Sequence, residues 1–294
     1  MANKRLREIV RVFSSVGFTT LKERKKPLDE QMAPAKLRLA FEQLGPSFVK
    51  IGQILSTRSD LLPDAYIKEL TRLQSNVLPL DKVLVMSAIE AELTQPLFDV
   101  FQSIDERPLA SGSVAQTHRA ILKTGQEVVV KIQRPHLAEI VDEDLSLLIG
   151  LSKKMPSGLI PMVNLTDVLY QLKDSLTTEI DFRNEAKAML KFAELNRRVK
   201  CVAVPKVYDE LTTSHMVVEE FIQGIPINRY EDLVHAGYDL EDIGQKLMLS
   251  FIKQVFKDGY FHGDPHPGNL LIKDGQIYFI DFGIMGHLEK DRKS

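Results

Sequence analysis

The residues best suited to chemistry lie in two short stretches of the sequence, His262-Gly-Asp-Pro-His-Pro-Gly-Asn269 and Ile280-Asp-Phe-Gly283. Asp264 can accept a proton from a hydroxyl group or a water molecule, and Asn269 can ligate a metal ion. Asp281 follows a strand-like run and can bridge that metal to a nucleotide phosphate. These groups suit phosphoryl transfer, in which the protein supplies positioning and electrostatics rather than covalent chemistry. The sequence therefore predicts a nucleotide-dependent enzyme.

An amphipathic helix is expected from Leu240 to Asp258 and leads directly into the first stretch, because its apolar residues recur every three or four positions. Two histidines, His262 and His266, flank Asp264. They could belong to a metal site, but structural packing is the favoured interpretation for histidines in such a loop.

Two strands joined by the turn Lys123–Gly125 are predicted at Ser113–Ala120 and Glu127–Ile132. Lys131 lies in the second strand, 19 residues after Gly112, where protein kinases place the lysine that contacts the α- and β-phosphates. A lone lysine in a strand is more often a surface residue.

The turn before these strands, Ala110-Ser111-Gly112-Ser113, occupies the place of a phosphate-covering loop but retains one glycine. Alanine and serine restrict φ, so we expect a stiff loop.

The carboxylate partner of Lys131 is expected in a helix over Asp174–Phe192, where Glu185 falls inside an apolar pattern. Glu179 and Asp181 are expected near the start of that helix, where the dipole favours carboxylates, so capping alone would also explain them.

Further strands are predicted at Val204–Val207 and His215–Glu219 and would complete a small lobe of five strands and one helix. Glu220–Gly224 is then typical of a hinge in which the backbone of Glu220 and Ile222 binds an adenine.

Several helices are predicted after Pro34 from apolar residues spaced three or four apart, with others at Pro63–Gln74 and Leu80–Leu93. Lys50 and Gln53 are one helical turn apart, so their polar ends could reach one target. Taken alone, the two residues are equally consistent with a solvated helix surface.

Composition indicates a globular protein of one to three domains, since the 294 residues are 44% hydrophobic and 27% charged. The single cysteine, Cys201, excludes an intramolecular disulfide and a cysteine-rich zinc site and agrees with a reducing compartment.

Basic residues are concentrated at the amino end: residues 1–26 hold eight Lys/Arg and two Asp/Glu, although the net charge of the chain is −2. Leu6–Leu21 predicts a basic amphipathic helix, which could lie on an anionic membrane or pack on its own protein. With no run of about 18 apolar residues and no secretory signal, we expect a cytoplasmic protein, peripheral on the inner membrane face and without a transmembrane helix.

Taken in order, these motifs resemble the UbiB family of atypical kinase-like proteins associated with ubiquinone biosynthesis. Lys50-Ile-Gly-Gln53 fits its KxGQ motif, Ala110–Ser113 its alanine-rich loop and Glu179-Ile-Asp181 its ExD motif. The remaining matches are the strand lysine Lys131, the helix glutamate Glu185, the catalytic loop with Asp264 and Asn269, and the metal-binding Asp281.

This resemblance implies an α+β, protein-kinase-like bilobal fold with an N-terminal helical extension. The segments would be a basic amphipathic start (1–33), a helical extension (34–104), an N-lobe with inserted helices (105–222) and a partial C-lobe (223–294). It also implies an ATPase or lipid-directed kinase that binds ATP or ADP with Mg²⁺, in which Lys50, Gln53, Glu179 and Asp181 gate the site against protein substrates. A quinone-precursor lipid and ubiquinone-biosynthesis proteins are the expected partners, and nucleic acid is not.

Family members continue well beyond the Asp-Phe-Gly segment, whereas this sequence stops eleven residues after Gly283. We therefore expect an incomplete helical lobe with an exposed apolar patch or a partner chain, and reduced or absent activity.

Two alternatives stay open. A phosphotransferase of the aminoglycoside or choline kinase type fits the catalytic loop equally well but lacks the KxGQ and ExD motifs. The second alternative is a nucleotide-gated scaffold, which binds lipid or protein without turnover.

Overall fold

The computed structural model describes the backbone of residues 2–23, 33–56, 58–59, 61–73, 78–154 and 165–288. The chain forms two compact units. The helical unit comprises Met1–Leu84, Pro108–Gln116 and Gln133–Ile180, and the sheet unit comprises Val85–Arg107, Thr117–Ile132 and Asp181–Ser294. The four segments expected from the sequence stay a prediction.

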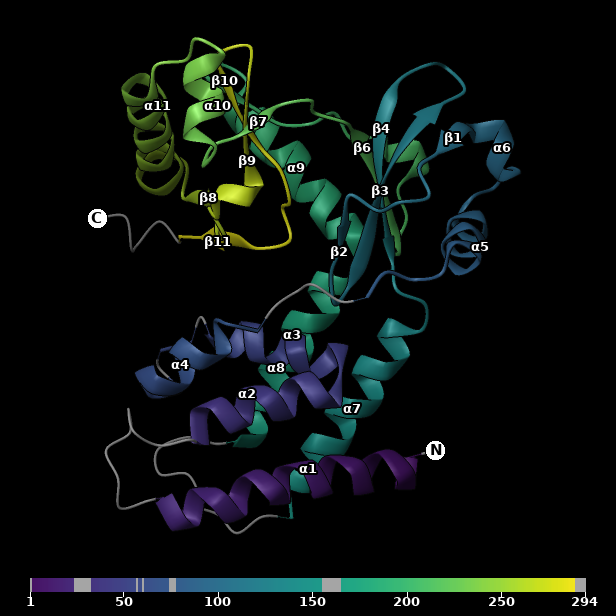
Figure 1. Ribbon diagram of the computed structural model, residues 1–294, viewed down its shortest axis with the longest axis vertical. Helices are drawn as coiled ribbons and strands as arrows, with labels where there is room; N and C mark the ends of the chain where they lie inside the picture. Colours follow the sequence, from purple (N-terminus) through teal and green to yellow (C-terminus); the bar gives the residue numbers. More distant parts are fainter. Residues whose placement is uncertain are drawn as a thin grey trace. The chain divides into compact units, whose positions relative to one another are not determined.

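The helical unit consists mainly of helices (Figure 1). Apolar side chains from these helices form its core. Its elements are α1 (Ala2–Glu23), α2 (Ala33–Leu44), α3 (Pro46–Ser56), α4 (Asp64–Leu70), the two-residue strand β2 (Ala110–Ser111), α7 (Leu137–Ser152) and α8 (Leu165–Ile180). The ring centroids of Phe13, Phe41 and Phe48 lie 5.9–6.2 Å apart, so α1, α2 and α3 share one aromatic cluster.

The basic amphipathic helix predicted at Leu6–Leu21 lies within α1, and its apolar side packs in this core. Ile9 and Val12 are buried, whereas Lys4, Arg7 and Arg11 are exposed. The side chains of 16–21 lie outside the described residues. Packing on its own protein is therefore the interpretation that the described part of α1 supports.

A buried carboxylate ties α1 to two other parts of the helical unit. Asp144 on α7 is 1% exposed and accepts hydrogen bonds from Arg5 Nε at 2.7 Å and Nη2 at 2.9 Å. The Ser47 hydroxyl at the start of α3 also donates to Asp144, and Arg5 Nη2 donates to the Leu44 carbonyl at 2.6 Å. The hydrogen bond with Asp144 raises the pKa of Arg5 despite its partial burial. These contacts form what we call the Asp144 clasp.

The first sheet of the sheet unit carries the predicted β-hairpin. Its strands are β1 (Phe101–Ile104), β3 (Ala115–Leu122), β4 (Glu127–Gln133) and β6 (Met216–Glu220), in the order β1-β3-β4-β6, with β2 pairing with β3. The predicted strand at His215–Glu219 is confirmed as β6. The strand predicted at Val204–Val207 is wrong: β5 is Val202–Ala203, and Val207 makes one isolated bridge. Pro205 lacks the N–H that a ladder needs.

Two smaller sheets position the stretches at 262–269 and 280–283. β7 (Ile225–Pro226), β9 (Leu270–Lys273) and β10 (Gln276–Phe279) join β5 in the order β5-β10-β9-β7. β8 (Tyr260–His262) pairs antiparallel with β11 (Met285–His287), with His262 opposite Met285. Because one stretch follows β8 and the other precedes β11, this ladder brings them side by side.

Helices complete the sheet unit: α5 (Lys82–Glu92), α6 (Leu97–Val100), α9 (Phe182–Asn196), α10 (Tyr230–His235) and α11 (Leu240–Ile252), with the short turns η2 (Asp209–Leu211) and η4 (Pro267–Asn269). The helix predicted at Leu240–Asp258 is confirmed, its last turn being the π-helix η3 (Lys253–Asp258). No described helix combines the length and the apolarity that a membrane crossing needs.

α11 and η3 have a buried side and an exposed side, and the exposed side is apolar. Ile243, Ser250 and Gln254 are buried on one side. The other side exposes Met248 (59%), Leu249 (64%), Ile252 (47%) and Phe256 (70%). At about 100° per residue these four positions cover one stripe, which we call the α11 stripe.

The single helix predicted over Asp174–Phe192 is wrong, because α8 ends at Ile180 and α9 begins at Phe182. Asp181 has an extended backbone (φ −88°, ψ 99°) and caps α9 by accepting from the Arg183 amide at 3.1 Å. Glu179 consequently lies in the last turn of α8, where the helix dipole disfavours a carboxylate. Its charge is balanced by Lys50 instead.

Candidate active site

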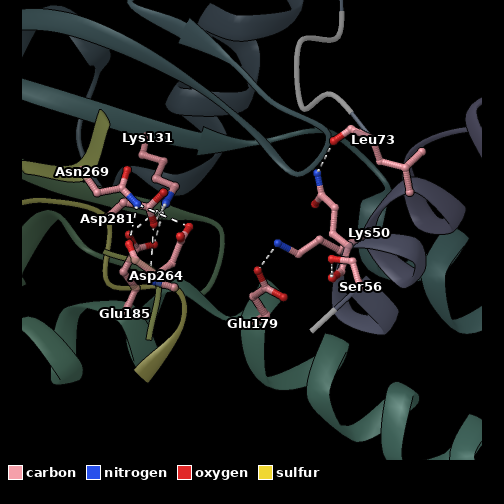
Figure 2. Close-up of polar contacts among 11 residues, drawn as sticks. Lys50, Ser56, Leu73, Lys131, Glu179, Glu185, Asp264, Asn269 and Asp281 are labelled. Atoms are coloured by element: carbon pink, nitrogen blue, oxygen red, sulfur yellow. Dashed lines mark hydrogen bonds and ion pairs between the residues drawn. The ribbon is translucent and has the colours of Figure 1, made fainter. Parts of the chain in front are cut away.

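The predicted pairing of Lys131 with Glu185 is present in the sheet unit (Figure 2). Lys131 Nζ donates to Glu185 Oε1 at 2.8 Å and Oε2 at 2.9 Å, and lies 3.4 Å from Asp281 Oδ1. Glu185 is 6% exposed. Strand β4, helix α9 and the segment after β10 therefore deliver three charged groups to one point.

Local structure explains this convergence. Along β4, Val128, Val130 and Ile132 are buried on one face, so Lys131 projects from the other. Glu185 stands in the first turn of α9, on the side that buries Ala186. The Lys131 ammonium also lies 5.3 Å from the centre of the Phe182 ring, a cation–π distance.

The charges around Lys131 shift the pKa values of the pair. Burial disfavours the Lys131 ammonium, but the carboxylates of Asp281 and Glu185 outweigh it and raise the pKa of Lys131. Burial raises the pKa of Glu185, and the nearby ammonium offsets this only in part. Lys131 therefore stays charged throughout the physiological range.

A further acid, Glu219, faces the same region and was not predicted from the sequence. Glu219 on β6 pairs in register with Val129, two residues from Lys131 on β4, so both side chains share one face of the sheet. Burial, together with Glu185 and Asp281, raises the pKa of Glu219 to about 8, although Lys131 opposes the shift. A glutamate following Met216-Val-Val at the end of an apolar strand was the signal in the sequence.

The catalytic loop brings Asp264 and Asn269 together. Asn269 Nδ2 donates to the Asp264 carbonyl at 3.1 Å and lies 3.4 Å from Oδ2. This orientation turns the amide oxygen of Asn269, a suitable ligand for a hard cation, away from the Asp264 carboxylate.

His262 is a structural residue that links the catalytic loop to the Asp281 segment. Its Nδ1 accepts from the Asp264 amide at 3.3 Å, so the proton is on Nε2, which donates to the Asp281 carbonyl at 2.8 Å. Burial lowers the pKa of His262. Its ring packs against Phe279 and Phe282.

Asp281 has a left-handed backbone with φ of 62°. This conformation costs a non-glycine residue about 1–3 kcal/mol, and such strain is concentrated at functional sites. The Gly283 amide lies 3.3 Å from Asp281 Oδ1, and Phe282 is buried against Phe192. The strained backbone directs the carboxylate towards Lys131.

The oxygen groups of Asp264, Asn269 and Asp281 fit Mg²⁺ better than a transition metal. Within the described ranges, no three His, Cys, Asp or Glu residues are arranged to hold a metal ion by themselves. Mg²⁺ usually takes one or two carboxylates and completes its shell with water and phosphate oxygens. His266 is exposed and accepts from the Gly268 amide at 3.1 Å, which gives it a role in the turn.

The hinge predicted at Glu220–Gly224 connects β6 with β7. The amide of Glu220 donates to the Lys206 carbonyl at 2.8 Å, and that of Phe221 donates to the Glu127 carbonyl at 3.1 Å. The Ile222 amide has no backbone acceptor among the residues that the structure describes. A Cβ on Gly224 would stand 2.9 Å from Leu271 Cβ, so this position must stay small.

The KxGQ residues lie in the helical unit, where Lys50 forms an ion pair with Glu179 of the ExD motif (Figure 2). Gln53 Nε2 lies 3.4 Å from the Leu73 carbonyl. A Cβ on Gly52 would collide with the side chains of Phe41 and Leu73, which explains the glycine. The other ExD acid, Asp181, belongs to the sheet unit and pairs with Arg183 at 2.7 Å.

The loop Ala110–Ser113 is restrained by Arg134 within the helical unit. Arg134 Nε donates to the Gly112 carbonyl at 2.8 Å and Nη2 donates to the Ser111 hydroxyl at 3.0 Å. The Gly112 amide donates a hydrogen bond to the Ala115 carbonyl at 2.8 Å, so this N–H group already has an acceptor within the protein.

Comparison with known proteins decides the family. Residues 72–294, most of the chain, match the ABC1 atypical kinase-like domain. The chain belongs to this family. Its kinase-like fold and the predicted resemblance to UbiB proteins are thereby confirmed.

Among ABC1-family relatives, an uncharacterised protein of the hydrogenase 1 5′ region of Clostridium pasteurianum is 47% identical over 98% of this chain and 54% of its own length. A probable protein kinase UbiB of Sodalis glossinidius is 35% identical over 90% of this chain and 50% of its own length. The chain thus spans about half the length of these two relatives. The solved complex of Rv3197 with erythromycin from Mycobacterium tuberculosis is 27% identical, with a TM-score of 0.57 over 98% of this chain and 68% of that protein.

Proposed function

We propose that this ABC1-family chain binds ATP or ADP with Mg²⁺ in its sheet unit and acts as an atypical kinase-like ATPase. The observation that carries the proposal is the convergence of Lys131 with Glu185 at 2.8 Å and Asp281 at 3.4 Å. This arrangement, next to the Asp264–Asn269 loop, supplies every charged group that phosphoryl transfer of the kinase type uses.

Each side chain has one task in this function. Lys131, held by Glu185, contacts the α- and β-phosphates, while Asn269 and Asp281 hold Mg²⁺. Bound Mg²⁺ neutralises the charge on the phosphate oxygens. Asp264 accepts the proton of the attacking water or hydroxyl group, and the backbone of Glu220 and Ile222 binds the adenine.

The biological setting is proposed from the resemblance of the motifs to the UbiB family: support of ubiquinone biosynthesis at a membrane, with protein-kinase activity disfavoured. The gating role expected for Lys50, Gln53, Glu179 and Asp181, and the phosphate-covering role expected for the loop 110–113, stay predictions. The exposed residues Lys4, Arg7 and Arg11 of α1 are spaced three and four apart and so share one helical face, which could meet an anionic membrane surface.

The test is nucleotide binding measured by calorimetry on the full chain with Mg²⁺ and ADP. Asp281→Asn should remove at least about tenfold in Mg²⁺-dependent affinity, because a charge-assisted contact is worth about 1.5–3 kcal/mol. Asp274→Asn is the matched control, since Asp274 is also an aspartate with positive φ (51°) but lies in the exposed β9–β10 turn. Unchanged binding in Asp281→Asn would refute the metal assignment.

The α11 stripe favours a second function, a nucleotide-gated scaffold that binds lipid or protein through an apolar surface without turnover. Phosphate release in the presence of anionic vesicles separates the two. Turnover that Asp264→Asn removes supports the ATPase, whereas nucleotide and vesicle binding with release equal to that of Asp264→Asn supports the scaffold.

A further inference from the structure

Glu219 is an acidic residue on the same face of the sheet as Lys131, and the proposed chemistry leaves it unused. It occupies β6 directly before the hinge at Glu220–Gly224. Glu219 lies opposite Val129, and Val129 precedes Lys131 on β4 by two residues. Along the strand direction, Glu219 and Lys131 are therefore about 7 Å apart. Glu219 therefore stands between the lysine that would meet the phosphates and the backbone that would meet the base.

The carboxyl group of Glu219 also lacks a protein partner. In the part of the chain that the structure describes, it makes no hydrogen bond and no ion pair, although Lys131 is held by Glu185 and Asp281 nearby. The side chain of Glu219 is half-buried, and a partly desolvated carboxyl group without a partner carries a cost. The neighbouring Ile222 amide is likewise without a backbone acceptor among the described residues.

The unused groups are chemically complementary to an aminopurine. A carboxyl oxygen accepts a hydrogen bond from an exocyclic amino group whether the carboxyl is charged or neutral. The hinge amide donates to a ring nitrogen. An amino group has two hydrogens, so the Glu220 carbonyl and the Glu219 carboxyl could each take one.

We propose that Glu219 is a specificity-determining residue that recognises the exocyclic amino group of the bound purine nucleotide. This inference rests on the proposed function, because it requires that the sheet unit bind a nucleotide. It adds a side-chain contact to the backbone recognition expected at the hinge.

The experiment compares ADP with purine riboside 5′-diphosphate, which lacks only the amino group, by titration calorimetry with Mg²⁺ on the full chain. In the unmodified protein, ADP should bind about tenfold or more tightly than the probe. Glu219→Leu should reduce this preference by about tenfold, whereas Glu219→Gln, which keeps an acceptor oxygen, should retain most of it. Glu210→Leu, which removes an exposed carboxylate on η2, should leave the preference unchanged.

The outcomes separate this inference from the function on which it rests. If ADP binds but its preference over the probe is the same in Glu219→Leu, the inference is overturned and nucleotide binding stands. If neither nucleotide binds to the unmodified protein, the proposed function is overturned and the inference with it. A preference lost equally in Glu219→Gln and Glu219→Leu would assign the effect to charge and would also overturn recognition by a hydrogen bond.

Discussion

Lys131 neutralises a carboxylate that water can barely reach. In Lys131→Met, Glu185 would still be buried but would have lost the ammonium that neutralises it. It could then become neutral only by binding a proton. We expect the free energy of unfolding to fall by about 1–3 kcal/mol, the usual cost of leaving a buried polar group unsatisfied. Urea unfolding at pH 7 measures this change.

The double variant Lys131→Met/Glu185→Gln provides the control, because it removes both charges together. Coupled residues are not additive, so the double variant should recover at least half of the loss seen in Lys131→Met. A double variant as unstable as the sum of the two single variants would contradict a stabilising pair.

Glu219 predicts a pH dependence of stability in the metal- and nucleotide-free protein. The pKa of Glu219 is about 8 in the folded state and 4.5 in its unperturbed state, so the folded protein binds more protons between these values. Stability should therefore fall as pH rises from about 4.5 to about 8 and stay low above that. Glu219→Gln should flatten this decline, which melting temperatures measured at pH 5 and pH 8 in EDTA would reveal. An equal decline in both proteins would refute the assignment.

Individual site residues could be predicted from the sequence where they belong to a motif with characteristic spacing. The spacing from Gly112 predicted Lys131, and the apolar pattern predicted Glu185, which the structure brings within 2.8 Å of it. Glu219 was missed because its position depends on strand register: a shift of one residue would have turned it to the other face. Register is set by tertiary packing, which a single sequence does not display.

The short break between α8 and α9 is made by one residue. Asp181 ends one helix and caps the next, and its contacts with Arg183 lower its pKa. Asp181→Ala should cost about 1 kcal/mol of stability through loss of the cap, whereas Asp181→Asn should cost little, because asparagine caps equally well.

The same two variants separate structure from function at the ExD motif. Asp181→Asn keeps the cap but not the charge, so a change in nucleotide binding or phosphate release in this variant alone would report a gating role. If both variants lose stability equally, the capping account is wrong.

The spacing of apolar residues predicted that this region is helical, but it did not predict where one helix ends and the next begins. Asp174–Phe192 keeps an apolar period across Asp181, so the pattern alone predicted one helix. Asp181, directly before Phe182, is a favourable N-cap residue and indicates a helix start. This indication was overlooked because Asp181 lies between two other acidic residues, Glu179 and Glu185. The consequence was that Glu179 was assigned to the wrong end of a helix.

Each of the two units has its own buried residues, and the Asp144 clasp lies in the helical unit. Arg5→Met would leave a carboxylate that is 1% exposed without its cation. Removing one partner of such a pair costs about 3–5 kcal/mol. We expect calorimetry to show a lower melting transition for the helical unit and an unchanged affinity of the sheet unit for Mg–ADP.

Arg7→Met is the matched control, since Arg7 is an exposed arginine of the same helix. It should change stability by no more than about 0.5 kcal/mol. Equal effects of the two substitutions would show that the clasp does not stabilise the unit. In the sequence, Arg5 is one of eight basic residues among residues 1–26. Its buried partner could not be predicted, because Asp144 lies 139 positions away and only the fold brings the two together.

The α11 stripe affects how the unfolding of this protein can be followed. Dyes that report unfolding bind to exposed apolar surface, so a protein that presents Met248, Leu249, Ile252 and Phe256 to solvent should make such a dye fluoresce before it is heated. The chain also has no tryptophan, although it has seven tyrosines. Melting should therefore be followed by calorimetry, circular dichroism or tyrosine emission, and a high initial dye signal should be taken as a property of the folded protein.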